Sequence, residues 1–210
     1  MAIRNASLRA SRGRTRRVTP RAARKSETHE RILKSARAIA RREGLRATSV
    51  PRVMSGAGLT VGGFYAHFPS KTAMDVEIVR SMLGSLPGRW LGGLEDSSGL
   101  EWATRAVDRY LSVAHRDNAD GCSYPAVLSE IAAAPAEVRQ EFAAALQARV
   151  RAFEAHVPPV AGSSVRERAL ATMALTIGGL LLSRASRGTA ISEELLAACK
   201  RWALPELDVA

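Results

Sequence analysis

Residues 48–68 read TSVPRVMSGAGLTVGGFYAHF, and this stretch decides the fold of the N-terminal part of the chain. A short helix is predicted to begin near Thr48 or Ser49 and to end at Gly56-Ala57-Gly58, because glycine favours the end of a helix. A second short helix follows, with Thr60 as its N-cap. Two short helices joined by a tight glycine-containing turn form the helix-turn-helix pattern.

The start of the second helix is the part of this unit that reads DNA. Such a helix enters the major groove with its N-terminal residues toward the base edges. Thr60 can bond a phosphate or a base, and Val61 can contact a thymine methyl group. Gly62 and Gly63 each cost about 0.8–1 kcal/mol relative to alanine in a helix. A glycine pair is therefore expected where another backbone comes close. The alternative is a loop that never becomes helical.

The end of the same helix carries aromatic residues on two sides. Phe64 and Phe68 are spaced by four and are expected to pack inward together. Tyr65 and His67 are then expected to meet the sugar-phosphate backbone. A half-buried structural histidine is the alternative for His67. Lys71 begins the next helix, where an ammonium group and free N–H groups suit a phosphate.

Residues 58–71, GLTVGGFYAHFPSK, preceded by TSVPRVMSGA, resemble the DNA-binding domain of the TetR family of repressors. The resemblance covers about residues 27–80. It implies an all-α homodimer of about nine helices, in which the first three helices bind an operator half-site and a divergent C-terminal body binds a small ligand. Pro51 departs from the family, which often has a polar residue there. By this resemblance, Thr48, Ser49, Tyr65, His67 and Lys71 match positions that hold phosphates, and Thr60, Val61 and Gly63 match positions near the bases.

Positive charge is concentrated at the start of the chain. Residues 1–26 hold nine arginines and lysines and no acid, so they carry nine of the eleven net positive charges. Arginine-rich segments without aromatic residues are normally disordered and attract polyanions. A solvated tail and a transit peptide are the alternatives. Some members of the family use such an arm in the minor groove.

The domain organisation follows from helical periodicity and from a glycine-rich interruption. We predict a disordered Arg-rich tail over 1–26, a helix-turn-helix DNA-binding domain over 27–83 and a ligand-binding and dimerisation domain over 84–210. Ser26 or Thr28 is expected to cap the first helix, and Gly44 to end it. The later helices are predicted at about 99–116, 124–133, 136–156, 164–185 and 191–203.

The last two predicted helices suit dimerisation. Residues 166–184 are apolar nearly all round and contain Gly178-Gly179, so this helix must be buried on several sides. The final helix is amphipathic. Two such helices per chain would form a four-helix bundle across a two-fold axis. Burial within one chain is the alternative.

Apolar and aromatic residues of the C-terminal body suggest a ligand pocket. The candidates for its wall are Trp102, Tyr110, Cys122, Tyr124, Phe142 and Met173. Cys122 lies just before a predicted helix, where the pKa of a thiol is lowered. A thiol-based sensor of electrophiles is thus one interpretation, and a plain buried cysteine is the other.

Other classes of function are disfavoured by the sequence. No Walker loop, G-x-S-x-G elbow or H-E-x-x-H spacing is present, so we expect no enzyme, no metal and no cofactor. The two cysteines show no disulfide framework and suit a reducing cytosol. The longest apolar run, 169–182, has 14 residues, whereas a membrane span needs roughly 17–25. We therefore expect a cytoplasmic protein.

The leading hypothesis is a TetR-type transcriptional regulator, a repressor that a small-molecule ligand releases from a palindromic operator. One alternative is a weakly sequence-specific DNA-packaging protein driven by the tail, which predicts a strong dependence on salt. Another is a regulator that senses electrophiles through Cys122. A third is a helical body that binds or converts small molecules and does not bind DNA.

Overall fold

The computed structural model describes residues 19–83, 92–118, 124–157, 159 and 162–204. Within these ranges the protein contains helices and no β-strand, which confirms the all-α prediction. The helices of the described residues are α1 (Pro20–Glu43), α2 (Val50–Gly56), the 3-10 helix η1 (Val61–Ala66), α3 (Lys71–Leu83), α4 (Gly99–Tyr110), α5 (Val113–Asp117), α6 (Tyr124–Ala132), α7 (Ala136–Glu154), α8 (Val165–Ala185) and α9 (Ala190–Ala203). None of them is long and apolar enough to cross a membrane.

The first helix begins earlier than predicted. It starts at Pro20 and is capped by Thr19, whose hydroxyl accepts a backbone N–H of the first turn at 3.3 Å. The prediction of a cap at Ser26 or Thr28 was therefore wrong, and the end of the predicted disordered tail is helical. The reason is local, because alanine, arginine and lysine, which fill residues 21–25, favour helix. Residues 1–18 lie outside the described part of the chain.

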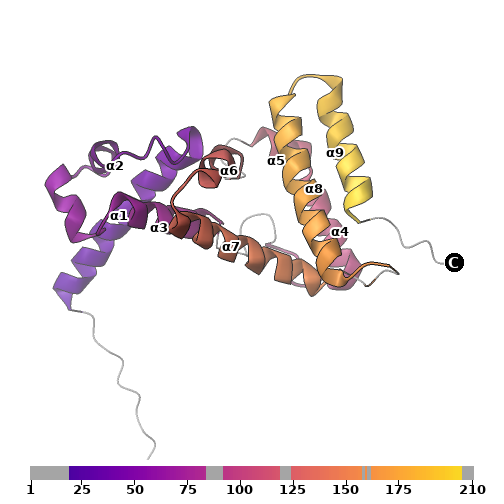
Figure 1. Cartoon of the computed structure of the whole chain (residues 1–210), viewed down its shortest axis with the longest axis horizontal. Coiled ribbons are helices and arrows are strands. Elements are labelled where there is room, and N and C mark those ends of the chain that lie inside the picture. Colours follow the sequence, from indigo (N-terminus) through magenta and orange to yellow (C-terminus); the bar gives the residue numbers. More distant parts are fainter. Residues whose placement is uncertain (1–18, 84–91, 119–123, 158, 160–161, 205–210) are drawn as a thin grey trace, which may run out of the picture.

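The N-terminal domain is held by one aromatic and aliphatic core. α1 packs against α2 and α3, and η1 packs against α2. Phe64 and Phe68 are fully buried, as predicted, together with Met54 and Met74. Ser70 caps α3, because its hydroxyl accepts the N–H of the third helical residue at 3.0 Å. This core fixes η1 at the end of the domain that lies away from α8 and α9 (Figure 1).

The C-terminal body follows the predicted helices with one break. The predicted helix over 99–116 is divided into α4 and α5 at Leu111 and Ser112. Leu111 is fully buried, and the Ser112 hydroxyl accepts the N–H of His115 at 3.1 Å, so Ser112 caps a new helix. The break is therefore a local capping interaction together with one buried leucine.

Helices α8 and α9 form an antiparallel pair at one end of the molecule (Figure 1). A side chain at Gly179 would place its Cβ 2.6 Å from Cys199 Sγ, so the glycine allows α9 to approach α8 closely there. Buried hydroxyls of α8 make hydrogen bonds to α9. Thr172 donates to the carbonyl of Ala203 at 2.7 Å, and Ser183 donates to the carbonyl of Ser192 at 2.8 Å.

Within the described residues, the N-terminal helices contact the C-terminal body in at least two places. Along α3 and α7, Arg80 pairs with Glu141 through two bonds of 3.0 and 2.7 Å, and the Arg149 guanidinium donates to the carbonyl of Leu83 at the end of α3. At the turn between α1 and α2, the Glu130 carboxylate of α6 accepts the backbone N–H of Arg46 at 2.9 Å. The C-terminal body thus contacts both α3 and the α1–α2 turn.

The α1–α2 turn is shaped by a glycine with a positive φ. Gly44 has φ +88° and ψ 172°, and its N–H donates to the carbonyl of Ala40 at 2.9 Å. A Cβ at this position would lie 2.4–2.9 Å from the Glu130 carboxylate. Both the backbone conformation and the neighbouring side chain therefore call for glycine.

Candidate nucleic-acid interface

The reading end of the helix-turn-helix is open to solvent. Thr60 has the extended backbone of an N-cap, and its side chain makes no capping hydrogen bond, so the hydroxyl is available to a partner. Val61 is 46% exposed, which is high for an apolar side chain. A Cβ added at Gly62 would meet no atom within 4 Å, whereas one at Gly63 would lie 3.6 Å from the Met54 methyl group. Gly62 therefore leaves open space for an approaching molecule.

The reading helix is a 3-10 helix, although the sequence pattern predicted a helix without specifying its type. The glycine pair explains this, because glycine destabilises an α-helix and 3-10 helices form in short segments. The backbone hydrogen bonds of η1 join residues three apart, as Gly63 N–H does with the Thr60 carbonyl at 3.1 Å.

Tyr65 is the most exposed aromatic residue of this helix, with 69% of its surface accessible. Its ring stands edge-on to buried Phe64 with the centroids 5.2 Å apart. Because the Tyr65 ring packs on Phe64 while most of its surface is exposed, its hydroxyl is available for a polar contact.

His67 is half-buried and differs from a simple phosphate ligand. Its Nδ1 is buried and has no hydrogen-bond partner within the described part of the chain. Burial lowers the pKa of His67, and the nearby charges of His29 and Lys25 lower it further. The imidazole is therefore neutral near pH 7, so any contact with a phosphate would be that of an uncharged donor.

Thr48 and Ser49 lie on different sides of the start of α2. Thr48 is fully buried, and its hydroxyl donates to the Leu45 carbonyl at 2.6 Å and approaches the Asp75 carboxylate at 3.4 Å. Its side chain is thus occupied inside the protein. Ser49 is exposed, caps α2 and makes no side-chain capping bond. Only Ser49 of this pair offers its hydroxyl at the surface.

Lys71 is bound to an acidic partner that the sequence reasoning missed. Its ammonium lies 2.6 and 2.8 Å from the two Asp75 oxygens and 3.1 Å from the Leu45 carbonyl. Asp75 is buried, which raises its pKa, and its bonds to Lys71 and Thr48 oppose that rise. The spacing of four residues between the lysine and the aspartate was the available signal.

Three further cations lie at the start of α1. Arg21, Arg24 and Lys25 are exposed, and among the described residues no carboxylate lies within ion-pair distance of them. Lys25 is close enough to His67 to lower its pKa, which places this end of α1 beside the end of η1. These residues belong to the segment that was predicted to be a disordered tail.

The predicted ligand-pocket residues fall into separate buried groups. The Trp102 ring stacks on His156 with 4.1 Å between centroids and stands edge-on to Phe153 at 5.3 Å. Tyr110 stands edge-on to His115 at 4.7 Å. The Trp102 contacts lie between α4 and the end of α7, and the Tyr110 contact joins α4 to α5.

The remaining predicted pocket residues lie elsewhere in the body. Tyr124 and Phe142 meet edge-on with their centroids 6.1 Å apart, and the Arg149 guanidinium lies 5.2 Å from the centre of the Tyr124 ring. Met173 is buried in α8. Cys122 lies outside the described residues.

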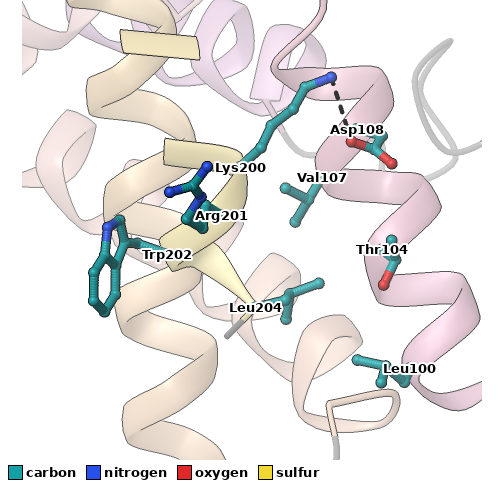
Figure 2. Close-up of a pocket in the computed structure, with 8 residues that line it drawn as sticks. All are labelled: Leu100, Thr104, Val107, Asp108, Lys200, Arg201, Trp202 and Leu204. Carbon is teal, nitrogen blue, oxygen red and sulfur yellow. Dashed lines mark ion pairs between the residues drawn. The ribbon is translucent and has the colours of Figure 1, made fainter. Parts of the chain in front are cut away.

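A groove of about 630 Å³ opens between α4 and the end of α9 (Figure 2). Its lining was not predicted, because it joins residues about 100 positions apart in the chain. The lining residues are Leu100, Thr104, Val107, Asp108, Lys200, Arg201, Trp202 and Leu204.

An all-helical chain that carries an exposed helix-turn-helix reading end on a separate helical body has the architecture of a helix-turn-helix regulator. Residues 32–78 match the family model described as "Bacterial regulatory proteins, tetR family". This stretch of the chain is therefore similar to the bacterial regulatory proteins of the tetR family.

Curated relatives match over part of the chain. The chain is 36% identical over 81 residues to the HTH-type transcriptional repressor KstR2 of Rhodococcus jostii (strain RHA1), a match that covers 37% of this chain and 40% of that protein. It is 41% identical over 59 residues to KstR2 of Mycobacterium tuberculosis (strain ATCC 25618 / H37Rv), which covers 28% of this chain and 30% of the relative. The chain thus matches less than half the length of these relatives.

Solved structures resemble the whole described fold. A TetR-family transcriptional regulator from Cytophaga hutchinsonii has a TM-score of 0.69 at 18% identity, covering 89% of this chain and 98% of its own. The reduced form of NemR from E. coli has a TM-score of 0.67 at 17% identity, covering 83% of this chain and 97% of its own. At these identities the likeness concerns the fold.

Proposed function

We propose that this chain is a DNA-binding transcriptional repressor of the TetR type, released from its operator by a small molecule that binds the C-terminal body. The observation that carries the proposal is the exposed reading end of η1, where Thr60, Val61 and Gly62 face solvent on a firmly packed core. An apolar side chain that is 46% exposed beside an open glycine suits contact with base edges and a thymine methyl group.

The proposed contacts divide into two groups. Thr60, Val61, Gly62 and Gly63 approach the bases, and Ser49, Tyr65 and Lys71 hold phosphates. His67 contributes a neutral donor at the edge of this surface. Thr48 is assigned a different task, since its buried hydroxyl supports the Leu45 turn and Asp75, and these in turn place Lys71.

The proposed assembly is a homodimer through α8 and α9. Both helices carry large apolar side chains at the surface, an arrangement that marks an interface. These are Leu170, Leu182, Ile191 and Trp202, which are 43, 57, 55 and 67% exposed. A two-fold dimer would present two η1 helices to a palindromic operator whose half-sites are about 34–36 Å apart. As a DNA-bound regulator the protein would act in the cytoplasm.

The test begins with selection of genomic fragments by the purified full chain at near-physiological salt. A single enriched palindrome is expected, whereas enrichment without sequence preference would instead favour packaging of DNA. Tyr65→Phe, which removes only the hydroxyl, should weaken operator binding by about 2- to 12-fold. Val113→Ala, an exposed apolar change on α5, is the control. Equal affinity of the Tyr65 variant and the wild type would refute its assigned contact.

The dimer is tested independently of DNA. Leu182→Asp should halve the mass measured by light scattering, because it buries a charge in the proposed interface. Val113→Asp introduces the same charge at a comparably exposed site outside α8 and α9 and should leave the mass unchanged. An unchanged mass in the Leu182 variant would exclude this interface.

A further inference from the structure

The groove between α4 and α9 changes character along its length. Leu100 and Leu204 lie at one end, and the Lys200–Asp108 pair lies at the other, with Val107 between them (Figure 2). Val107 is almost fully buried and forms the floor, whereas Leu100 remains 40% exposed. A molecule that matches this gradient has an apolar body and a polar head.

The charges of the groove define the sign of that head. Lys200 Nζ lies 3.3 Å from Asp108 Oδ1, so this lysine is partly compensated. Arg201 is exposed, and no carboxylate in the described part of the chain lies within ion-pair distance of it. The lining therefore carries one net positive charge, and a planar guanidinium suits a carboxylate or a similar anion.

α4 presents two different faces, and the groove uses the outer one. Trp102, Ala103 and Ala106 pack into the core of the body. Leu100 and Thr104, spaced by four, lie on the groove face. Ligand pockets in proteins typically have volumes of about 300–1,000 Å³, and the groove, with about 630 Å³, falls in that range.

We propose that this groove binds a small amphipathic organic anion, with its apolar part over Leu100, Val107 and Leu204 and its charged head at Arg201. This inference rests on the proposed function, because it names the chemical class of the effector. α4 is the first described helix after the N-terminal domain, and α9 belongs to the proposed dimer face. A molecule held between them changes how the dimer carries its two N-terminal domains.

A second copy of the chain is the competing occupant. Trp202 lines the groove and is also exposed on α9, but Leu170, Leu182 and Ile191, the other exposed apolar residues of α8 and α9, do not line the groove. The groove also carries an uncompensated cation, which a small anion complements and an apolar interface does not. These two features favour the small anion.

The experiment uses sodium decanoate as the probe, with decan-1-ol as its neutral analogue, titrated below their solubility limits into the purified full chain by calorimetry. Decanoate is expected to saturate one site per chain and to bind at least about tenfold more tightly than the alcohol, because only the anion pairs with Arg201. Equal binding of the two compounds, or no saturable binding, overturns the proposal.

Two variants locate the site. Thr104→Trp fills the groove from an exposed position of α4 and should abolish decanoate binding, and Arg201→Ala should weaken it at least about fivefold. Arg105→Ala removes an exposed cation of α4 outside the groove and is the matched control. Undiminished binding to the Thr104 variant would mean that decanoate binds elsewhere. Dissociation of the dimer by Thr104→Trp would mean that a second copy occupies the groove, and this also overturns the proposal.

The effector role has its own measurement. Decanoate should weaken binding of the wild type to its selected operator by about 5- to 150-fold, the usual range of such coupling, and should leave the Thr104 variant unaffected. Decanoate binding without any change in operator affinity overturns the effector role. Failure to bind any operator refutes the proposed function instead, whereas the calorimetric test of the groove needs no DNA.

Discussion

Replacing Gly44 by alanine is expected to lower the free energy of unfolding by about 2–4 kcal/mol through two separable effects. The first is the backbone, since φ +88° with ψ 172° belongs almost only to glycine and costs other residues about 1–3 kcal/mol. The second is Glu130, because the new Cβ would lie 2.4 Å from its Oε1. The flexible carboxylate will move away and give up its bond to the Arg46 N–H, which contributes about 0.5–1.5 kcal/mol.

A double-mutant cycle separates these effects. Glu130→Ala alone should cost only the hydrogen bond, about 0.5–1.5 kcal/mol. In Gly44→Ala that bond is already broken, so the double variant should be no less stable than Gly44→Ala itself. Urea unfolding followed by circular dichroism gives the three free-energy differences. Strict additivity would show that the carboxylate does not sit over Gly44, and a Gly44 variant as stable as the wild type would refute the backbone argument.

Gly62→Ala is the matched glycine control. Its added Cβ meets no atom within 4 Å, and its backbone lies outside the region that favours glycine. The unfolding free energy should therefore stay the same or rise by up to about 1 kcal/mol. The contrast between Gly44 and Gly62 thus tests the structure of the turn rather than the general effect of removing a glycine.

Three further predictions concern the nucleic-acid interface. Lys71→Ala should weaken operator binding and also lower the unfolding free energy by about 1–3 kcal/mol, because it removes the partner of the buried Asp75. Tyr65→Ala should weaken binding but change the unfolding free energy by no more than about 0.5 kcal/mol. Equal effects of the two changes on stability in denaturant titrations would contradict the Lys71–Asp75 pair. The lowered pKa of His67 means that the unfolded chain takes up this proton more readily than the folded one, so its contribution to stability is complete above pH ~6.5 and is lost as the pH falls below that value. Thermal melts between pH 7.5 and 5 should show a smaller loss of stability with falling pH in His67→Gln than in the wild type. Part of the pH dependence should remain in the variant, because burial also lowers the pKa of His115. The same pH dependence in both proteins would argue against a buried neutral His67. The triple change Arg21→Ala, Arg24→Ala and Lys25→Ala should reduce the slope of log K against log salt by about 0.9 for each phosphate that these three side chains neutralise, and an unchanged slope would separate the start of α1 from the DNA.

The sequence predicted what local patterns determine. The end of the first helix at Gly44 was placed correctly, because the glycine that ends a helix is a neighbour of that helix in the chain. The start of α1 was missed because clustered positive charge predicted disorder, whereas the helix propensity of residues 21–25 favours a helix. The break at Ser112 was missed because a hydroxyl cap inside a helical period leaves the period unchanged.

The candidate site was predicted less completely, for a physical reason. Exposure of Tyr65 and burial of Phe64 follow from helical spacing, which residues 64–68 display. The inward position of Thr48 depends on Asp75, which lies 27 residues further along the chain and meets it only in the folded protein. The groove that joins Leu100 to Lys200 depends likewise on packing between α4 and α9, which no local pattern records.

The contact between Gly179 and Cys199 gives the protein an internal reporter of motion. Because the half-buried sulfur lies where a side chain of α8 would otherwise stand, and burial raises the pKa of this thiol, Cys199 should react more slowly with a bulky thiol reagent than an exposed cysteine does. In a Cys122→Ser background, the rate of labelling would therefore report how closely α9 packs on α8. Slower labelling at higher protein concentration would show that the partner subunit holds the pair closed.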